Sequence, residues 1–87
     1  MYNVYNIYIM YDSRLPPRNE EAERAVLASM LISREAIDTT SQNLRTEDFS
    51  SNTHKMIFNA IIQLNRENHT ADILTTVEEL RRLGELE

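Results

Sequence analysis

Hydrophobic positions from residue 19 onward recur with the three- and four-residue spacing of amphipathic helices. Four segments have this pattern, and each follows a polar residue whose side chain commonly caps a helix. We therefore expect four helices joined by short polar connections. The predicted helices are a first from Glu20 after Asn19, a second over about 34–44 after Ser33, a third from Ser51 or Asn52 to about Asn65, and a fourth between Asp72 and Gly84.

The apolar side chains of these segments predict a single core. The third helix has the densest apolar stripe and is expected at the centre, whereas the fourth should turn Ile73, Leu74 and Leu83 inward and pair Glu78 with Arg82 outside. The predicted fold class is all-α, a small orthogonal-type bundle of about four helices. The predicted core consists of Ala22, Val26, Met30, Ile37, Leu44, Phe49, Ile57, Phe58, Ile61, Ile62, Val77 and Leu80.

Composition narrows the class of protein further. The chain has 87 residues with one glycine, two prolines and no cysteine, which excludes a fold of many short strands, a glycine-rich phosphate loop, disulfides and thiolate metal sites. Hydrophobic residues make up 41% and charged residues 26%, and no apolar run is long enough to cross a bilayer. We therefore expect a cytoplasmic globular chain that contacts no membrane.

The N-terminal segment differs from the rest of the chain. Residues 1–11 carry no charge and contain all four tyrosines, and Pro16 and Pro17 predict an extended lead-in before the first helix. We therefore divide the chain into an arm, residues 1–13, and a helical domain, residues 14–87. The arm is either a disordered tail or a segment ordered by packing or by pairing with another chain.

No group of residues has the spacing of a catalytic or metal site. The two histidines, His54 and His69, lack a second ligand nearby in sequence, and His54 is expected to pack or cap at the start of the third helix. The acidic residues that open the first helix, including Glu23, are interpreted as solvated side chains favoured by the helix dipole. The net charge of −5 argues against binding to DNA or RNA. Composition and pattern thus predict a small acidic helical interaction domain without a cofactor.

The opening of the domain resembles a known family. The run RLPPRNEEAERAVLASML, residues 14–31, is similar to the opening of the N-terminal domain of bacterial DnaB-type replicative DNA helicases, and residues 44–61 and 72–84 resemble two further blocks of that family in the same order. This chain departs from the family at Ala28, where glycine is usual, and at residues 50–53, where an aromatic residue and a proline are more common. The matching motif residues are Arg14, Pro16, Pro17, Asn19, Glu21, Ala22, Glu23, Ala25, Val26 and Leu27.

The resemblance implies a non-catalytic collar domain. In that family six such domains form a ring above an ATP-dependent motor, regulate its loading and offer a docking surface for primase. The resemblance therefore implies primase, neighbouring helicase subunits and a helicase loader as partners. The present chain has no Walker motif, so ATP hydrolysis is not expected in it. Two alternatives stay open: a stand-alone mimic from a mobile element that competes for these partners, and the helicase-binding domain of a primase.

Overall fold

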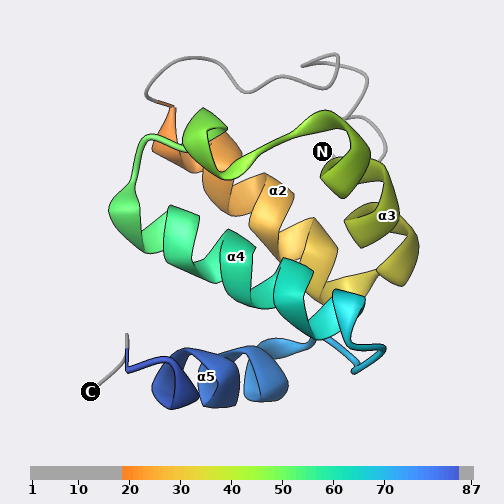
Figure 1. The fold of residues 1–87 in the computed structure, drawn as a ribbon. Coiled ribbons are helices and arrows are strands. Elements are labelled where there is room, and N and C mark those ends of the chain that lie inside the picture. The colour runs from red at the N-terminus through yellow and green to blue at the C-terminus, as the bar shows by residue number, and fades with distance from the viewer. Residues whose placement is uncertain (1–18, 85–87) are drawn as a thin grey trace.

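A computed structural model describes residues 19–84, and this part of the chain is helical without a β-strand (Figure 1). The prediction of an all-α fold with four helices is confirmed. The extended lead-in and the tyrosine-rich arm lie outside the described residues. The elements are α2 (Glu20–Ile32), α3 (Arg34–Asn43), the 3₁₀ helix η1 (Thr46–Asp48), α4 (Asn52–Arg66) and α5 (Ile73–Arg82).

Each described α-helix is preceded by a capping residue whose side chain accepts a hydrogen bond from a backbone amide in the first turn. Asn19 caps α2 at 2.9 Å, Ser33 caps α3 at 3.2 Å, Ser51 caps α4 at 3.3 Å and Asp72 caps α5 at 2.9 Å. Such caps satisfy amides that have no partner within the helix, and each typically contributes about 1 kcal/mol. Polar residues in the sequence therefore fix the helix starts locally.

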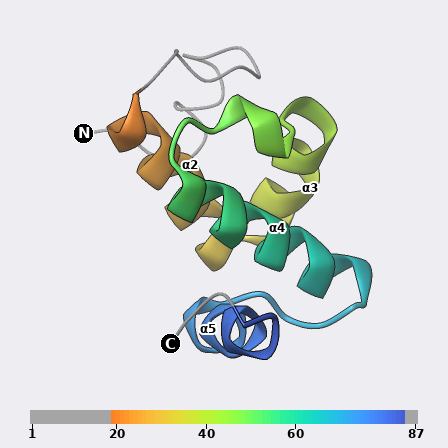
Figure 2. The same cartoon turned by 60° about the vertical axis from the view of Figure 1, so that its left-hand side comes forward.

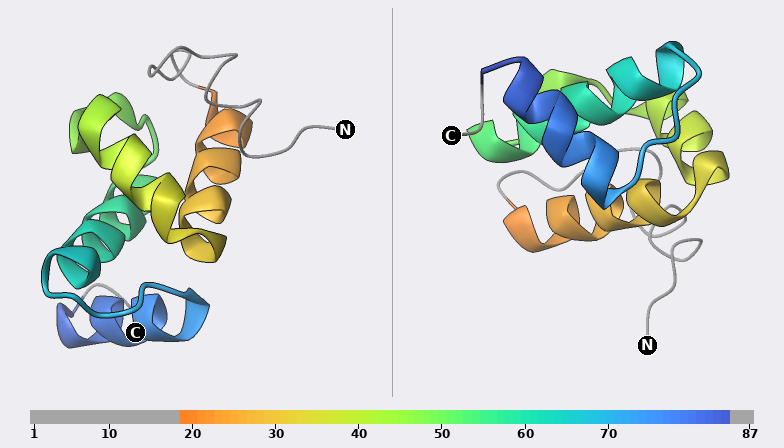
Figure 3. Two further views of the ribbon diagram at one scale, coloured as in Figure 1. Left: turned by 90° about the vertical axis from the view of Figure 1, so that its right-hand side faces the viewer. Right: turned by 90° about the horizontal axis from the view of Figure 1, so that it is seen from below.

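The ends of the helices follow from equally local causes. Ser33 is the single residue between α2 and α3, and its extended backbone stops one helix while its side chain starts the next. The chain consequently changes direction sharply there, and α3 runs away from α2 (Figure 3, left). After α5, Gly84 has a φ of +77°, a left-handed conformation that glycine adopts without steric cost.

Helix α4 is the central element of the described fold. It contacts α2, α3, η1 and α5, and α5 lies along its far side from α3 (Figures 1 and 2). Ile61 of α4 is completely buried, and the ring of Phe58 packs against Phe49 with centroids 4.9 Å apart. Burial of these side chains in one cluster is the main force that holds such a small domain together.

The burial of the predicted core residues is uneven. Ile57, Ile62 and Val77 are half-buried, contrary to prediction; Ile57 and Ile62 pack against the edge of the cluster. The α4 stripe is wider than the surface that its neighbours cover, so its margins reach solvent. The other nine residues are buried in the structure: Ala22, Val26, Met30, Ile37, Leu44, Phe49, Phe58, Ile61 and Leu80.

The orientation of α5 differs from prediction. Ile73, Leu74 and Leu83 are 69%, 66% and 44% exposed, whereas Thr76 and Glu79 are buried. Among the described elements α5 packs mainly on α4, so only one narrow side of it is covered, and that side is offset from its apolar stripe.

The ion pair predicted for α5, between Glu78 and Arg82, is wrong in its acidic partner. Arg82 donates two hydrogen bonds to Glu79, at 3.0 and 2.7 Å, rather than pairing with Glu78. Glu79 lies on the covered side of the helix, where a carboxylate requires a partner, whereas Glu78 faces water.

None of the helices in residues 19–84 is long and apolar enough to cross a membrane.

Candidate functional site

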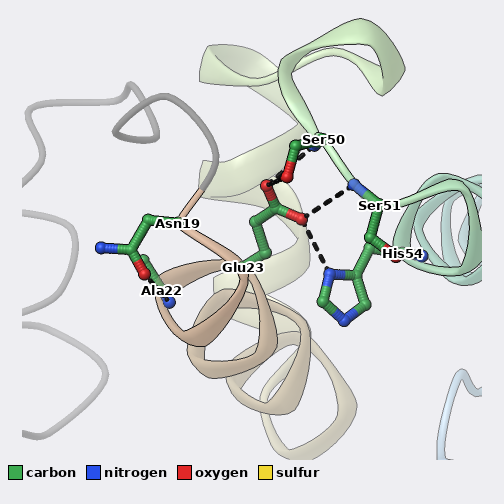
Figure 4. A network of polar contacts seen from close by, with 6 residues as sticks. All are labelled: Asn19, Ala22, Glu23, Ser50, Ser51 and His54. Carbon is green, nitrogen blue, oxygen red and sulfur yellow. Dashed lines mark hydrogen bonds and ion pairs between the residues drawn. The ribbon is translucent and has the colours of Figure 1, made fainter.

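A buried carboxylate joins α2 to the start of α4 (Figure 4). Glu23, in the first turn of α2, is 0% exposed. Its Oε2 accepts hydrogen bonds from the amide of Ser50 at 2.8 Å and from the Ser50 hydroxyl at 2.7 Å. Its Oε1 accepts one from the amide of Ser51 at 3.4 Å and contacts Nδ1 of His54 at 2.8 Å. We call Glu23, Ser50, Ser51 and His54 the Glu23 junction.

The hydrogen bonds of the junction keep the carboxylate ionised. Burial by itself raises the pKa of Glu23, but the hydrogen bonds from His54, Ser50 and Ser51 outweigh it and lower the pKa to about 2. An ionised carboxylate only accepts hydrogen bonds, so Nδ1 of His54 carries the proton in this contact. Each donor therefore stabilises the charge instead of competing with it.

The Glu23 junction positions helices rather than a substrate. Both carboxylate oxygens are engaged, and the side chain has no contact with solvent. The negative charge also lies beside the first turn of α4, where the helix dipole favours an anion. The arrangement fixes the angle at which α4 leaves the preceding loop.

The motif residues that suggested a family have different places in this structure. Asn19 caps α2 through Ala22, and Glu23 forms the junction. Ala22, Val26 and Leu27 are buried, Ala25 is half-buried and Glu21 is exposed. Arg14, Pro16 and Pro17 lie outside the described residues. The buried motif residues thus hold the helices together.

Sequence reasoning missed the role of Glu23 and gave His54 only a general one. A signal was present, because Glu23 precedes the buried residues Val26 and Leu27 by three and four positions and so lies on the same face of the helix. A carboxylate on a core face requires a buried partner. Its partners could not be identified, since they follow 27 to 31 residues later in the chain.

No cluster of three or more metal-binding side chains occurs within residues 19–84. His69 is exposed and lies 3.9 Å from Glu67, at the limit of an ion pair. His54 already uses Nδ1 in the Glu23 junction.

The fold and the shared motif define a small all-α domain of the kind found at the N-terminus of replicative helicases. The chain belongs to the DnaB-like helicase N terminal domain family, which matches residues 15–87. It is similar to the crystal structure of the N-terminal domain of DnaB helicase from Mycobacterium tuberculosis, with a TM-score of 0.76 and 37% sequence identity. That match covers 80% of this chain and 49% of the solved one.

Several longer proteins to which the chain is similar are replicative DNA helicases. The chain is 49% identical over 74 residues to the replicative DNA helicase DnaB of Rhodothermus marinus, covering 85% of this chain and 8% of that protein. It is 40% identical over 68 residues to DnaB of Treponema pallidum (strain Nichols), covering 78% of this chain and 16% of that protein. It is 35% identical over 78 residues to the replicative DNA helicase DnaC of Bacillus subtilis (strain 168), covering 90% of this chain and 17% of that protein. The chain therefore spans less than a fifth of the length of these relatives.

Proposed function

We propose that this chain acts as a non-catalytic N-terminal collar domain of a replicative DNA helicase, in the cytoplasm and without a cofactor of its own. Its task is protein contact: with neighbouring helicase subunits, with primase during primosome assembly, and with a helicase loader. The observation that carries the proposal is the structural match to a DnaB N-terminal domain at 37% identity. ATP hydrolysis and strand separation belong, in this proposal, to other parts of the parent helicase.

The organisation of the domain supports a role in protein contact. Several residues of the family motif are buried and stabilise the helix arrangement, among them Glu23, Val26 and Leu27. The exposed surface of the domain is therefore the part that is left for contact with partners. The described residues include seven basic and eleven acidic side chains, a net charge of −4. Such a charge disfavours the phosphate backbone as a ligand and is compatible with protein surfaces.

The test is a binding titration of the whole 87-residue chain against purified primase and purified replicative helicase from the same organism, each alone. We expect saturable binding to one or both by isothermal titration calorimetry, and we expect added helicase to compete with this chain for primase. Circular dichroism must show that the chain is helical under the same conditions. A folded chain that binds neither protein would contradict the proposal.

A further inference from the structure

A groove of about 370 Å³ lies between the end of α3, η1 and one side of α4. Leu44, Phe58 and Ile62 form its apolar part. Leu44 and Phe58 belong to the buried cluster, and Ile62 packs against that cluster. The groove consequently has a base that the core holds in place.

The rim of the groove presents two cations. Arg45 and Arg66 both line it, both are exposed, and neither forms an ion pair with any side chain that the structure describes. By contrast, Arg82 on α5 is fully engaged with Glu79. One acidic residue, Glu47, is in the lining. The groove is therefore locally positive on a domain whose described residues carry a net negative charge.

The polar side chains between the arginines are already held by neighbours. The hydroxyl of Thr46 donates to Asn59, which links η1 to α4, and the amide of Gln63 donates to Glu67 at 2.8 Å. These contacts order the rim, and the two guanidinium groups are its cations. An ordered site costs less entropy to occupy than a mobile one.

We propose that this groove binds an acidic segment of a protein partner that also carries a leucine or a similar aliphatic side chain. The aliphatic side chain packs on Ile62, the half-buried residue of the apolar part, and flanking carboxylates pair with Arg45 and Arg66. The inference rests on the proposed function only in that both assign protein contact to the chain. Arginine suits this role because its planar guanidinium pairs with a carboxylate through two hydrogen bonds.

A single-stranded nucleic acid fits the same groove less well. Binding without sequence preference uses exposed aromatic rings on which bases stack, together with a run of cations along the backbone. The aromatic residue of the groove, Phe58, is only 4% exposed, so its ring is not available for stacking. Two arginines beside Glu47 provide a short positive site rather than a track.

The first experiment maps binding on the unsubstituted 87-residue chain by NMR chemical shifts. The probe is the capped acidic pentapeptide LEELE, and the matched controls are LKKLK, GEEGE and a 15-nucleotide oligo-dT. We expect LEELE to give saturable shifts, confined to amides around the groove such as those of Arg45, Asn59 and Ile62, with weaker effects from all three controls. Shifts elsewhere, equal shifts with LKKLK or GEEGE, or tighter binding of oligo-dT to the same amides would each overturn the proposal.

The second experiment removes the cations. We expect the double variant R45Q/R66Q to bind LEELE about three- to tenfold more weakly, the range that two exposed ion pairs provide. The control R24Q/R81Q makes the same change in net charge away from the groove and should bind like the unsubstituted chain. Equal weakening in both variants would show a general effect of charge and refute the assignment. If R45Q/R66Q does not fold, the NMR mapping on the unsubstituted chain still decides whether the groove binds the peptide. Neither experiment uses primase or helicase, so their outcome is independent of the test of the proposed function.

Discussion

Replacement of Glu23 by glutamine tests whether the buried carboxylate is as important as its geometry indicates. Glutamine has nearly the same shape but no charge, and its amide nitrogen takes the place of one carboxylate oxygen, so it cannot accept the hydrogen bonds from Ser50 at one oxygen or those from Ser51 and His54 at the other. The pKa of Glu23 is lowered from 4.5 to about 2 in the folded protein. At about 1.4 kcal/mol for each pH unit, ionisation of Glu23 stabilises the fold by about 3 kcal/mol at neutral pH. That is a large share of the roughly 5–15 kcal/mol typical of a small domain.

The sign of the pH dependence follows from the direction of the shift. Because the pKa of Glu23 is lower in the folded than in the unfolded chain, the stabilisation is fully present above about pH 4.5 and is lost as the pH falls toward 2. Urea unfolding at neutral pH should therefore give a free energy of unfolding about 3 kcal/mol lower for Glu23→Gln than for the unsubstituted chain. The difference should shrink steadily between pH 4.5 and 2, since the protonated carboxyl then resembles the amide.

Glu21→Gln is the matched control, because Glu21 lies in the same first turn of α2 and is exposed. It removes the same charge from the helix terminus, which changes stability by about 0.3–1 kcal/mol through the helix dipole. If Glu23→Gln cost no more than Glu21→Gln, or if its cost did not depend on pH, the account of the Glu23 junction would be refuted.

Three further predictions concern the helix faces. Ile61→Ala, which empties a fully buried position at the centre of α4, should cost about 2–5 kcal/mol in urea unfolding, while the exposed control Glu78→Ala should change stability little. Thr76→Val should raise the melting temperature, because the buried hydroxyl of Thr76 has no hydrogen-bond partner among the described residues. Burial of such a hydroxyl costs roughly 1–3 kcal/mol. An unchanged or lower melting temperature would contradict the prediction. Replacing the exposed Ile73 and Leu74 together by glutamine should change the free energy of unfolding by less than about 1 kcal/mol, and a loss as large as that of Ile61→Ala would mean that α5 is oriented as the sequence pattern first indicated.

Helix positions and caps could be predicted because their causes are local. Asn19, Ser33, Ser51 and Asp72 each bond to an amide three residues ahead, so the sequence around each cap contains both partners. The central place of α4 was also predictable, since no other segment carries so dense an apolar stripe. The family assignment depended on the same short-range patterns.

The facing of α5 and the Glu23 junction could not be predicted, because both depend on contacts distant in sequence. An apolar stripe indicates which side of a helix prefers burial, but the neighbours decide which side is covered, and α5 has one main neighbour among the described elements. The position of Glu23 on the same face of α2 as Val26 and Leu27 indicates that its carboxylate needs a buried partner, but it does not identify that partner. The donors come from Ser50, Ser51 and His54, where the chain returns to α2.

The Glu23 junction also gives the serines at positions 50 and 51 of this chain a structural role. Ser50 contributes two donors to Glu23, its amide and its hydroxyl, and Ser51 contributes its amide while its hydroxyl caps α4. A proline at either position would remove an amide donor that the buried carboxylate uses. The serines therefore serve the carboxylate and the helix start together. Helix α4 contributes Ile61 to the core and Phe58 to the base of the groove. The direction that the junction gives to the first turn of α4 therefore determines where both side chains lie.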